Sequence, residues 1–245
     1  MFTIQTINDL LQTRSPLFEE LRNAYDLLPP TVCRRKTQCC SLLPEMTLIE
    51  ALAALQQVKA FPPPLRLQIT QNLVRYFFLN AVKISGCPFL QGDACRIYAD
   101  RFFGCRAYGL WSAAHYETIA AGSRRAKKNL QHQWQTLGVI LPREVTDYCI
   151  PYCPDVHVVG EETINDAILL KAADRIETLS VSLDRWHQSY QTTYFKDLSF
   201  LVASLLLGVT QAVRLKFTIV RDILSTGNRS GLSHLIEELP EILPD

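Results

Sequence analysis

The chain has 245 residues, of which 48% are hydrophobic and 20% are charged, and its formal net charge at pH 7 is +1. This composition predicts a folded protein with a hydrophobic core and excludes a disordered chain. The near-zero charge argues against binding to nucleic acid or to an anionic membrane surface through bulk electrostatic attraction.

Helical spacing of apolar residues dominates the first part of the chain, and no run alternates as a strand would. We predict helices over residues 3–12, 17–28, 47–60 and 65–82. Ser15 followed by Pro16 is typical of an N-cap and first helical position, and Thr47 with Glu50 has the pattern of a capping box. The N-terminal segment has neither the basic nor the apolar region of a secretory signal peptide, so we expect a cytoplasmic protein.

Helical spacing returns in the second part of the chain. We predict helices over residues 113–137, 163–187, 195–225 and 232–239. Ser112 is the expected N-cap of the first, and the basic run 124–128 within it is interpreted as a solvated face. The most apolar run, residues 198–213, is shorter than the roughly 20 residues that span a membrane, so we expect no membrane span and a buried core helix there.

The cysteines end at Cys153, and long amphipathic helices follow. We therefore predict a cysteine-cluster region over residues 1–155 and a helical scaffold over residues 156–245, or one continuous domain. The predicted fold class is all-α, an irregular helical bundle whose cysteine-rich loops hold a metal or an iron–sulfur centre.

Eight cysteines need a chemical explanation in a reducing compartment, where disulfides rarely persist. They stand in three groups: Cys33, Cys39 and Cys40; Cys87, Cys95 and Cys105; and Cys149 with Cys153. Thiolates are soft ligands that suit zinc and the irons of an iron–sulfur cluster. A predicted helical hairpin separates the first two groups and can bring its ends together, so we expect both groups to hold one inorganic centre.

The second cysteine group resembles the YkgJ-like family, a cysteine-cluster family described as chelating zinc or iron. That family has a first motif C-x-x-C-G-x-C-C, then C-P-F-L, then C-x-I-Y followed by an arginine and C-R. In this chain residues 87–90 read CPFL, residues 95–98 read CRIY, and Arg101, Cys105 and Arg106 follow in register. Glu50 also falls where the family tends to have a glutamate, and the resemblance covers about residues 31–108.

The first cysteine group departs from the family motif at two positions. Cys33, Cys39 and Cys40 occupy its first, third and fourth cysteine positions. Lys36 stands in place of the second cysteine and Thr37 in place of the glycine. The resemblance therefore implies a zinc or iron site that lacks one of the family's thiols.

Cys149 and Cys153 are candidates to replace that thiol, with His157 four residues further on. The alternative is two buried thiols and a surface histidine. More than four clustered thiols exceed the needs of one structural zinc, which favours an iron–sulfur cluster of [4Fe–4S] type, with zinc as the alternative. Eight thiols would suffice for two clusters. Nearby aromatic residues would shield a cluster or simply pack in the core: Tyr98, Phe102, Phe103 and Tyr108.

Arg96, Arg101 and Arg106 recur every five residues around the second cysteine group. They would offset the charge of a thiolate-bound cluster, bind an anionic substrate, or form surface salt bridges. Three functions follow: a cytoplasmic iron–sulfur protein in redox chemistry, electron transfer or maturation of a partner enzyme; an enzyme whose open cluster iron acts on a small anionic substrate; and a zinc-stapled interaction module. The pattern assigns no catalytic residue.

Overall fold

Helices form most of this protein, whose computed structural model describes residues 1–33, 37–160 and 164–243. In these ranges the helices are α1 (Ile4–Thr13), α2 (Ser15–Tyr25), α3 (Leu48–Ala60), α4 (Pro63–Leu79), α5 (Phe103–Ala107), α6 (Ala113–Thr136), α7 (Arg143–Thr146), α8 (Asp166–Val181), α9 (Arg185–Thr192), α10 (Leu198–Leu207), α11 (Val209–Thr226), α12 (Ser230–Glu237) and the 3-10 helix η1 (Gln38–Ser41). The predicted all-α class is therefore confirmed.

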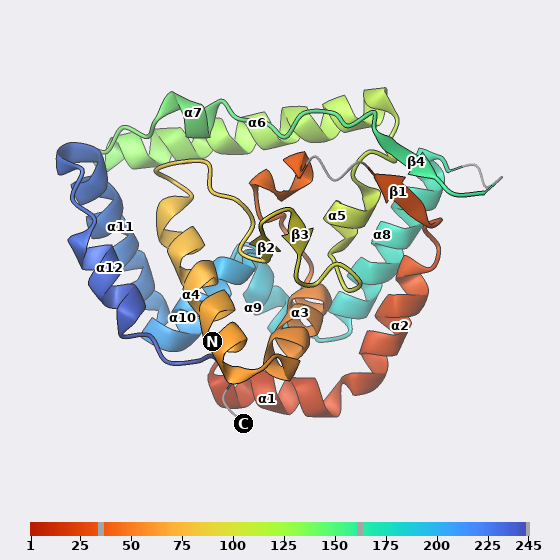
Figure 1. Ribbon diagram of the computed structural model, residues 1–245, viewed down its shortest axis with the longest axis horizontal. Helices are drawn as coiled ribbons and strands as arrows, with labels where there is room; N and C mark the ends of the chain where they lie inside the picture. Colours follow the sequence, from red (N-terminus) through yellow and green to blue (C-terminus); the bar gives the residue numbers. More distant parts are fainter. Residues whose placement is uncertain (34–36, 161–163, 244–245) are drawn as a thin grey trace.

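The hydrophobic core is built around α3, α4 and α10, and α4 packs extensively against α10. Its fully buried members come from early and late parts of the chain alike, among them Ile7, Leu52, Phe78, Tyr190 and Val202. The two predicted regions, 1–155 and 156–245, thus contribute to one main core. Figure 1 shows α6 and α1 at opposite edges of the molecule, with η1, α5 and the small strands between them.

Two predicted helix starts are confirmed at atomic detail. The Thr47 hydroxyl accepts from the Glu50 amide at 3.5 Å, and the Glu50 carboxylate accepts from the Thr47 amide at 3.0 Å, which completes a capping box. The Ser112 hydroxyl accepts from the His115 amide and caps α6. Ser15, by contrast, is the first residue of α2 and makes no capping hydrogen bond, so that prediction was wrong.

Two long predicted helices are broken in the structure. The helix expected over 163–187, whose residue 163 lies outside the described ranges, ends at Val181, and α9 begins after Asp184. The helix expected over 195–225 is split at Gly208, whose φ of 79° is a conformation that glycine adopts without steric cost. No single helix in the described ranges has both the length and the apolarity to cross a membrane; α10 and α11 meet that test together, but they are bent by 109°.

Two short antiparallel strand pairs were not predicted. Strand β1 (Thr31–Cys33) pairs with β4 (Val156–Val158), and β2 (Leu90–Gln91) pairs with β3 (Ala94–Cys95). Strands of two or three residues are too short to display an alternating pattern in the sequence. They matter because each pair carries or flanks cysteines and so fixes the backbone at these positions.

Candidate metal centre

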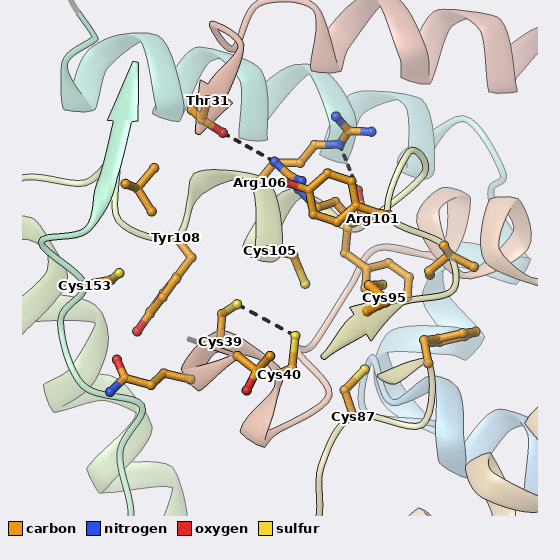
Figure 2. A pocket seen from close by; sticks show the side chains of 18 of the residues that line it. Thr31, Cys39, Cys40, Cys87, Cys95, Arg101, Cys105, Arg106, Tyr108 and Cys153 are labelled. Atoms are coloured by element: carbon orange, nitrogen blue, oxygen red, sulfur yellow. Dashed lines mark hydrogen bonds between the residues drawn. The ribbon is translucent and has the colours of Figure 1, made fainter. Parts of the chain in front are cut away.

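Six cysteine side chains line one pocket of about 230 Å³, although they come from three separate segments of the chain. They are Cys39, Cys40, Cys87, Cys95, Cys105 and Cys153. Figure 2 shows the sulfurs of Cys39, Cys40 and Cys105 directed toward one another across this pocket. The structure therefore places members of all three predicted groups around the same space.

The first group enters the pocket from η1. Thr37 precedes η1 with a left-handed φ of 54°, and its carbonyl accepts from the Cys40 amide at 2.8 Å. The sulfurs of Cys39 and Cys40 lie 3.8 Å apart. The side chain of Cys33 lies outside the described residues, so its place in the predicted ligand set stays a prediction.

The second group is tied directly to the first. The Cys87 amide donates to the Cys40 carbonyl at 2.7 Å, which joins the two segments on either side of the α3–α4 hairpin. The Cys87 carbonyl in turn accepts from the Leu90 amide at 2.9 Å, and this turn leads into the β2–β3 hairpin that ends at Cys95. Backbone hydrogen bonds thus hold Cys40, Cys87 and Cys95 along one wall.

Cys105 is positioned by α5, and α5 is held in place by Glu50. The Glu50 side chain is 4% exposed, and one of its carboxylate oxygens accepts from the Phe103 amide at 2.6 Å and from the Tyr25 hydroxyl at 3.0 Å. The other oxygen accepts from Thr47. A buried carboxylate is stable only when its oxygens are hydrogen-bonded. The capping-box pattern revealed the bond to Thr47, but nothing in the sequence pattern showed that Glu50 also anchors α5.

Cys153 reaches the pocket because its segment packs closely on Gly109. A Cβ atom on Gly109, whose φ is 82°, would lie 2.6 Å from Val156 Cγ2 and 3.2 Å from the Cys153 carbonyl. The Tyr108 hydroxyl donates to the Pro151 carbonyl at 2.7 Å and draws the same segment in. The segment is further held by the pairing of β4 with β1.

The other two candidates of the third group lie away from the pocket. The Cys149 sulfur contacts the Ala120 carbonyl of α6 at 3.7 Å and is absent from the pocket lining among the described residues. His157 is exposed on β4, opposite Val32. Of the proposed replacements for the missing thiol, Cys153 alone has a described side chain at the pocket.

The three arginines have different environments. Arg96 is exposed and does not line the pocket. Arg106 donates to the Arg101 carbonyl at 2.8 Å and to the Ala99 carbonyl, and its guanidinium lies 4.2 Å from the centroid of the Tyr25 ring. Arg106 is therefore occupied in holding the loop before α5.

Arg101 lines the pocket with fewer contacts. Its Nη2 lies 3.5 Å from the Thr31 hydroxyl oxygen, and its guanidinium stacks 4.2 Å from the centroid of the Tyr98 ring. Its Nε is buried and has no hydrogen-bond partner among the described residues. Within those residues, Arg101 also forms no ion pair with a carboxylate.

Burial keeps most of the pocket thiols protonated. It raises the pKa of Cys87 to about 12 and raises the pKa values of Cys95 and Cys105 as well. The hydrogen bond between the Cys39 and Cys40 thiols lowers the pKa of Cys39 to about 7 and raises the pKa of Cys40. Further thiolates would need a cation to offset their charge, as happens when a metal displaces thiol protons.

The described thiols lie around a cavity and do not converge on one point. No three His, Cys, Asp or Glu side chains of the described residues converge closely enough to hold one metal ion. A tetrahedral zinc bound at about 2.3 Å would bring its sulfurs about 3.8 Å apart. The six thiols instead line a cavity of about 230 Å³.

Aromatic side chains close off part of this cavity. Phe102, which is 2% exposed, packs edge-on against Phe89 with ring centroids 5.9 Å apart, and both line the pocket. Tyr98 and Tyr108 line it too, whereas Phe103 packs against Trp111 instead. Burial raises the pKa of Tyr108, so its hydroxyl stays neutral.

No protein-family model, no curated protein and no solved structure matches the chain. The resemblance to the YkgJ-like family rests on its sequence motifs, and function has to be argued from the pocket.

Proposed function

We propose that the protein binds one iron–sulfur cluster, of [4Fe–4S] type, in the cysteine-lined pocket. Its role would be redox chemistry, electron transfer or the maturation of a partner enzyme. The observation that carries this proposal is the gathering of six thiols from three chain segments around one cavity. A [4Fe–4S] cluster takes four thiolate ligands, so this set is sufficient without Cys149.

The chemistry of the surrounding residues supports the proposal. The seven cysteines whose side chains are described are free thiols, as suits ligands in a reducing cytoplasm. Phe89 and Phe102 would limit access of water, and Glu50 would keep Cys105 in place. The cluster would supply a site that accepts and donates one electron, and hydrogen bonds and charges nearby would tune its potential.

The conformation of Thr37 supports the resemblance to the YkgJ-like family. Thr37 stands where that family has glycine, and its φ of 54° lies in the left-handed region that glycine favours. Zinc is the second candidate, because the 3.8 Å separation of the Cys39 and Cys40 sulfurs equals the spacing of two thiolates on one tetrahedral ion.

The test is elemental analysis and electron paramagnetic resonance on the full chain purified without oxygen. We expect about four irons and four sulfides per chain, with brown colour and absorption near 400 nm. Cys87→Ser and Cys105→Ser should each lose most of the iron, whereas Cys149→Ser, whose thiol faces α6, should keep it. One zinc per chain without sulfide would overturn the cluster, and full iron in both pocket variants would overturn the site.

A further inference from the structure

Arg101 lines the same pocket as the thiols, and its guanidinium makes few hydrogen bonds there. Arg106 lies five residues away, but its guanidinium donates to two backbone carbonyls. Arg96 is exposed to solvent. Arg101 has one long hydrogen bond to Thr31, a stacking contact with Tyr98 and a buried Nε that meets no acceptor among the described residues. A buried donor without an acceptor destabilises the protein, and a bound anion would supply the missing acceptor.

Thr31 adds a second donor beside Arg101. Its hydroxyl oxygen accepts from Arg101 Nη2, so its own hydrogen remains available to a ligand. Figure 2 shows Thr31 and Arg101 at one end of the pocket and Cys40 and Cys87 at the other. A ligand at the arginine end would therefore lie beside a cluster held at the thiol end.

The other residues that line the pocket determine which kind of anion it favours. Ile97, Phe102 and Val156 offer apolar surface, which favours a ligand with an apolar body. Asp93 also lines the pocket, and its charge disfavours a multiply charged group such as phosphate. A planar guanidinium matches the two oxygens of a carboxylate.

We propose that the pocket binds a small monocarboxylate with an apolar body, whose carboxylate is held by Arg101 and the Thr31 hydroxyl. Carboxylate binding requires only the pocket and these two side chains. The further statement, that the carboxylate is a substrate or regulator of an iron–sulfur cluster, rests on the proposed function.

The test is isothermal titration of the full chain, kept free of oxygen, with four probes: benzoate, butyrate, benzamide and inorganic phosphate. Benzoate should bind best, butyrate less well because it buries less apolar surface, and neutral benzamide at least tenfold more weakly than benzoate. Phosphate binding tighter than benzoate would overturn the monocarboxylate, and binding of none of the probes would overturn the site.

Variants locate the carboxylate. Arg101→Met should weaken benzoate at least tenfold, while the matched variant Arg96→Met should leave it unchanged. Thr31→Val should weaken benzoate binding several-fold, whereas Thr31→Ser, which keeps the hydroxyl, should bind benzoate as the unmodified chain does. Circular dichroism checks that each variant folds. Unchanged binding in Arg101→Met, or equal losses in both arginine variants, would overturn the assignment.

Iron content separates this inference from the proposed function. If the chain carries no iron but binds benzoate through Arg101, the cluster is wrong and the anion site stands. If iron is present and Arg101→Met changes the reduction potential while benzoate binds to neither form, Arg101 serves the cluster charge alone and the anion site is overturned.

Discussion

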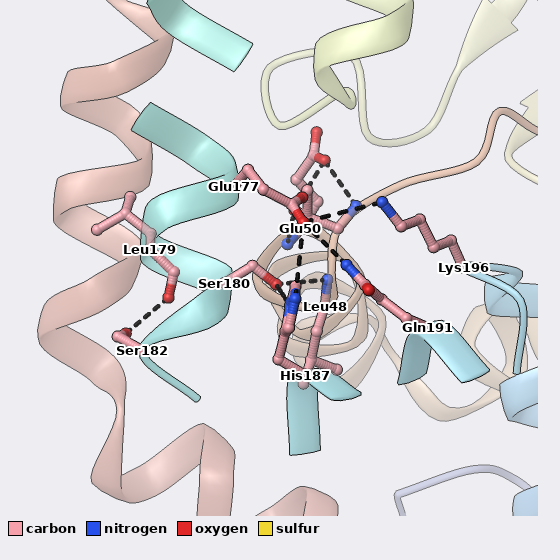
Figure 3. A network of polar contacts seen from close by, with 10 residues as sticks. Leu48, Glu50, Glu177, Leu179, Ser180, Ser182, His187, Gln191 and Lys196 are labelled. Carbon is pink, nitrogen blue, oxygen red and sulfur yellow. Dashed lines mark hydrogen bonds and ion pairs between the residues drawn. The ribbon is translucent and has the colours of Figure 1, made fainter. Parts of the chain in front are cut away.

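Two groups of polar residues differ in how completely their hydrogen-bonding atoms are paired. In the first, around α8 and α9, the buried Ser180 hydroxyl accepts from the Leu48 amide at 3.0 Å and contacts His187 Nδ1 at 3.0 Å. Figure 3 shows Glu177 beside this histidine, with its carboxylate accepting from Gln191 at 2.9 Å. In the cysteine pocket, by contrast, Arg101 Nε is buried and has no hydrogen-bond partner among the described residues.

The first cluster has the residue types of a catalytic triad but not its accessibility. Ser180 is 0% exposed, and its oxygen already receives the first amide of α3. The same oxygen lies 3.0 Å from His187 Nδ1, and His187 Nε2 lies 3.6 Å from a Glu177 carboxylate oxygen. No substrate can reach this serine, so the network serves stability. A completed polar network holds the fold, whereas an incomplete one beside a cavity is suited to binding.

The largest effect should come from Glu50, because this carboxylate supports both α3 and the cysteine pocket. Glu50→Ala would leave the Phe103 amide and the Tyr25 hydroxyl without their acceptor. We expect a loss of about 3 kcal/mol in the free energy of unfolding, measured with denaturant, together with lower iron content. Glu237→Ala, an exposed site on α12, is the control and should change neither quantity. Normal stability in Glu50→Ala would refute the anchoring role.

The next effect should come from the close approach at Gly109. In Gly109→Ala the new methyl group would overlap Val156 at 2.6 Å, and the backbone would have to keep a φ of 82°. We expect a loss of about 2 kcal/mol and displacement of the Cys153 segment from the pocket. Gly122→Ala is the matched control, because nothing lies within 4 Å of its Cβ position on α6. That variant should instead gain up to about 1 kcal/mol, since alanine is the better helix former.

The variant Ser180→Ala tests whether the Ser180 network and the cysteine pocket have independent roles. It removes the acceptor of the Leu48 amide, so we expect a loss of about 1–2 kcal/mol. Iron content should stay at the level of the unmodified chain, because Ser180 and His187 are not among the described residues that line the pocket. Cys87→Ser should show the reverse, with iron lost and the metal-free stability little changed. Loss of iron in Ser180→Ala would mean that the Ser180 network also supports the cysteine pocket.

The sequence predicted those features that depend on neighbours along the chain. The capping box at Thr47 and the cap at Ser112 are local patterns, and each is present. The break of the long apolar run at Gly208 was missed, because an isolated glycine is compatible with a continuous helix.

The candidate site was predictable in part for the same reason. Turn-rich cysteine segments pointed to a shared centre, and the structure places Cys39, Cys87 and Cys153 at one pocket. The different surroundings of Arg101 and Arg106 were not predictable, because they depend on Thr31 and Tyr25 far away in the sequence. A constant spacing of five residues says nothing about which guanidinium finds carbonyl acceptors.

The smallest effect should come from Thr37, which enters η1 in a left-handed conformation next to Cys39 and Cys40. A left-handed φ costs a residue with a Cβ about 1–2 kcal/mol, and glycine avoids this cost but loses more entropy on folding. Thr37→Gly should therefore gain roughly 0.5 kcal/mol in the free energy of unfolding, with iron content unchanged. Thr118→Gly, on the exposed face of α6, should lose a few tenths of a kcal/mol, because its backbone is helical. Opposite signs for the two variants would show that strain is stored at the pocket, whereas a loss in both would show that Thr37 is relaxed where it stands.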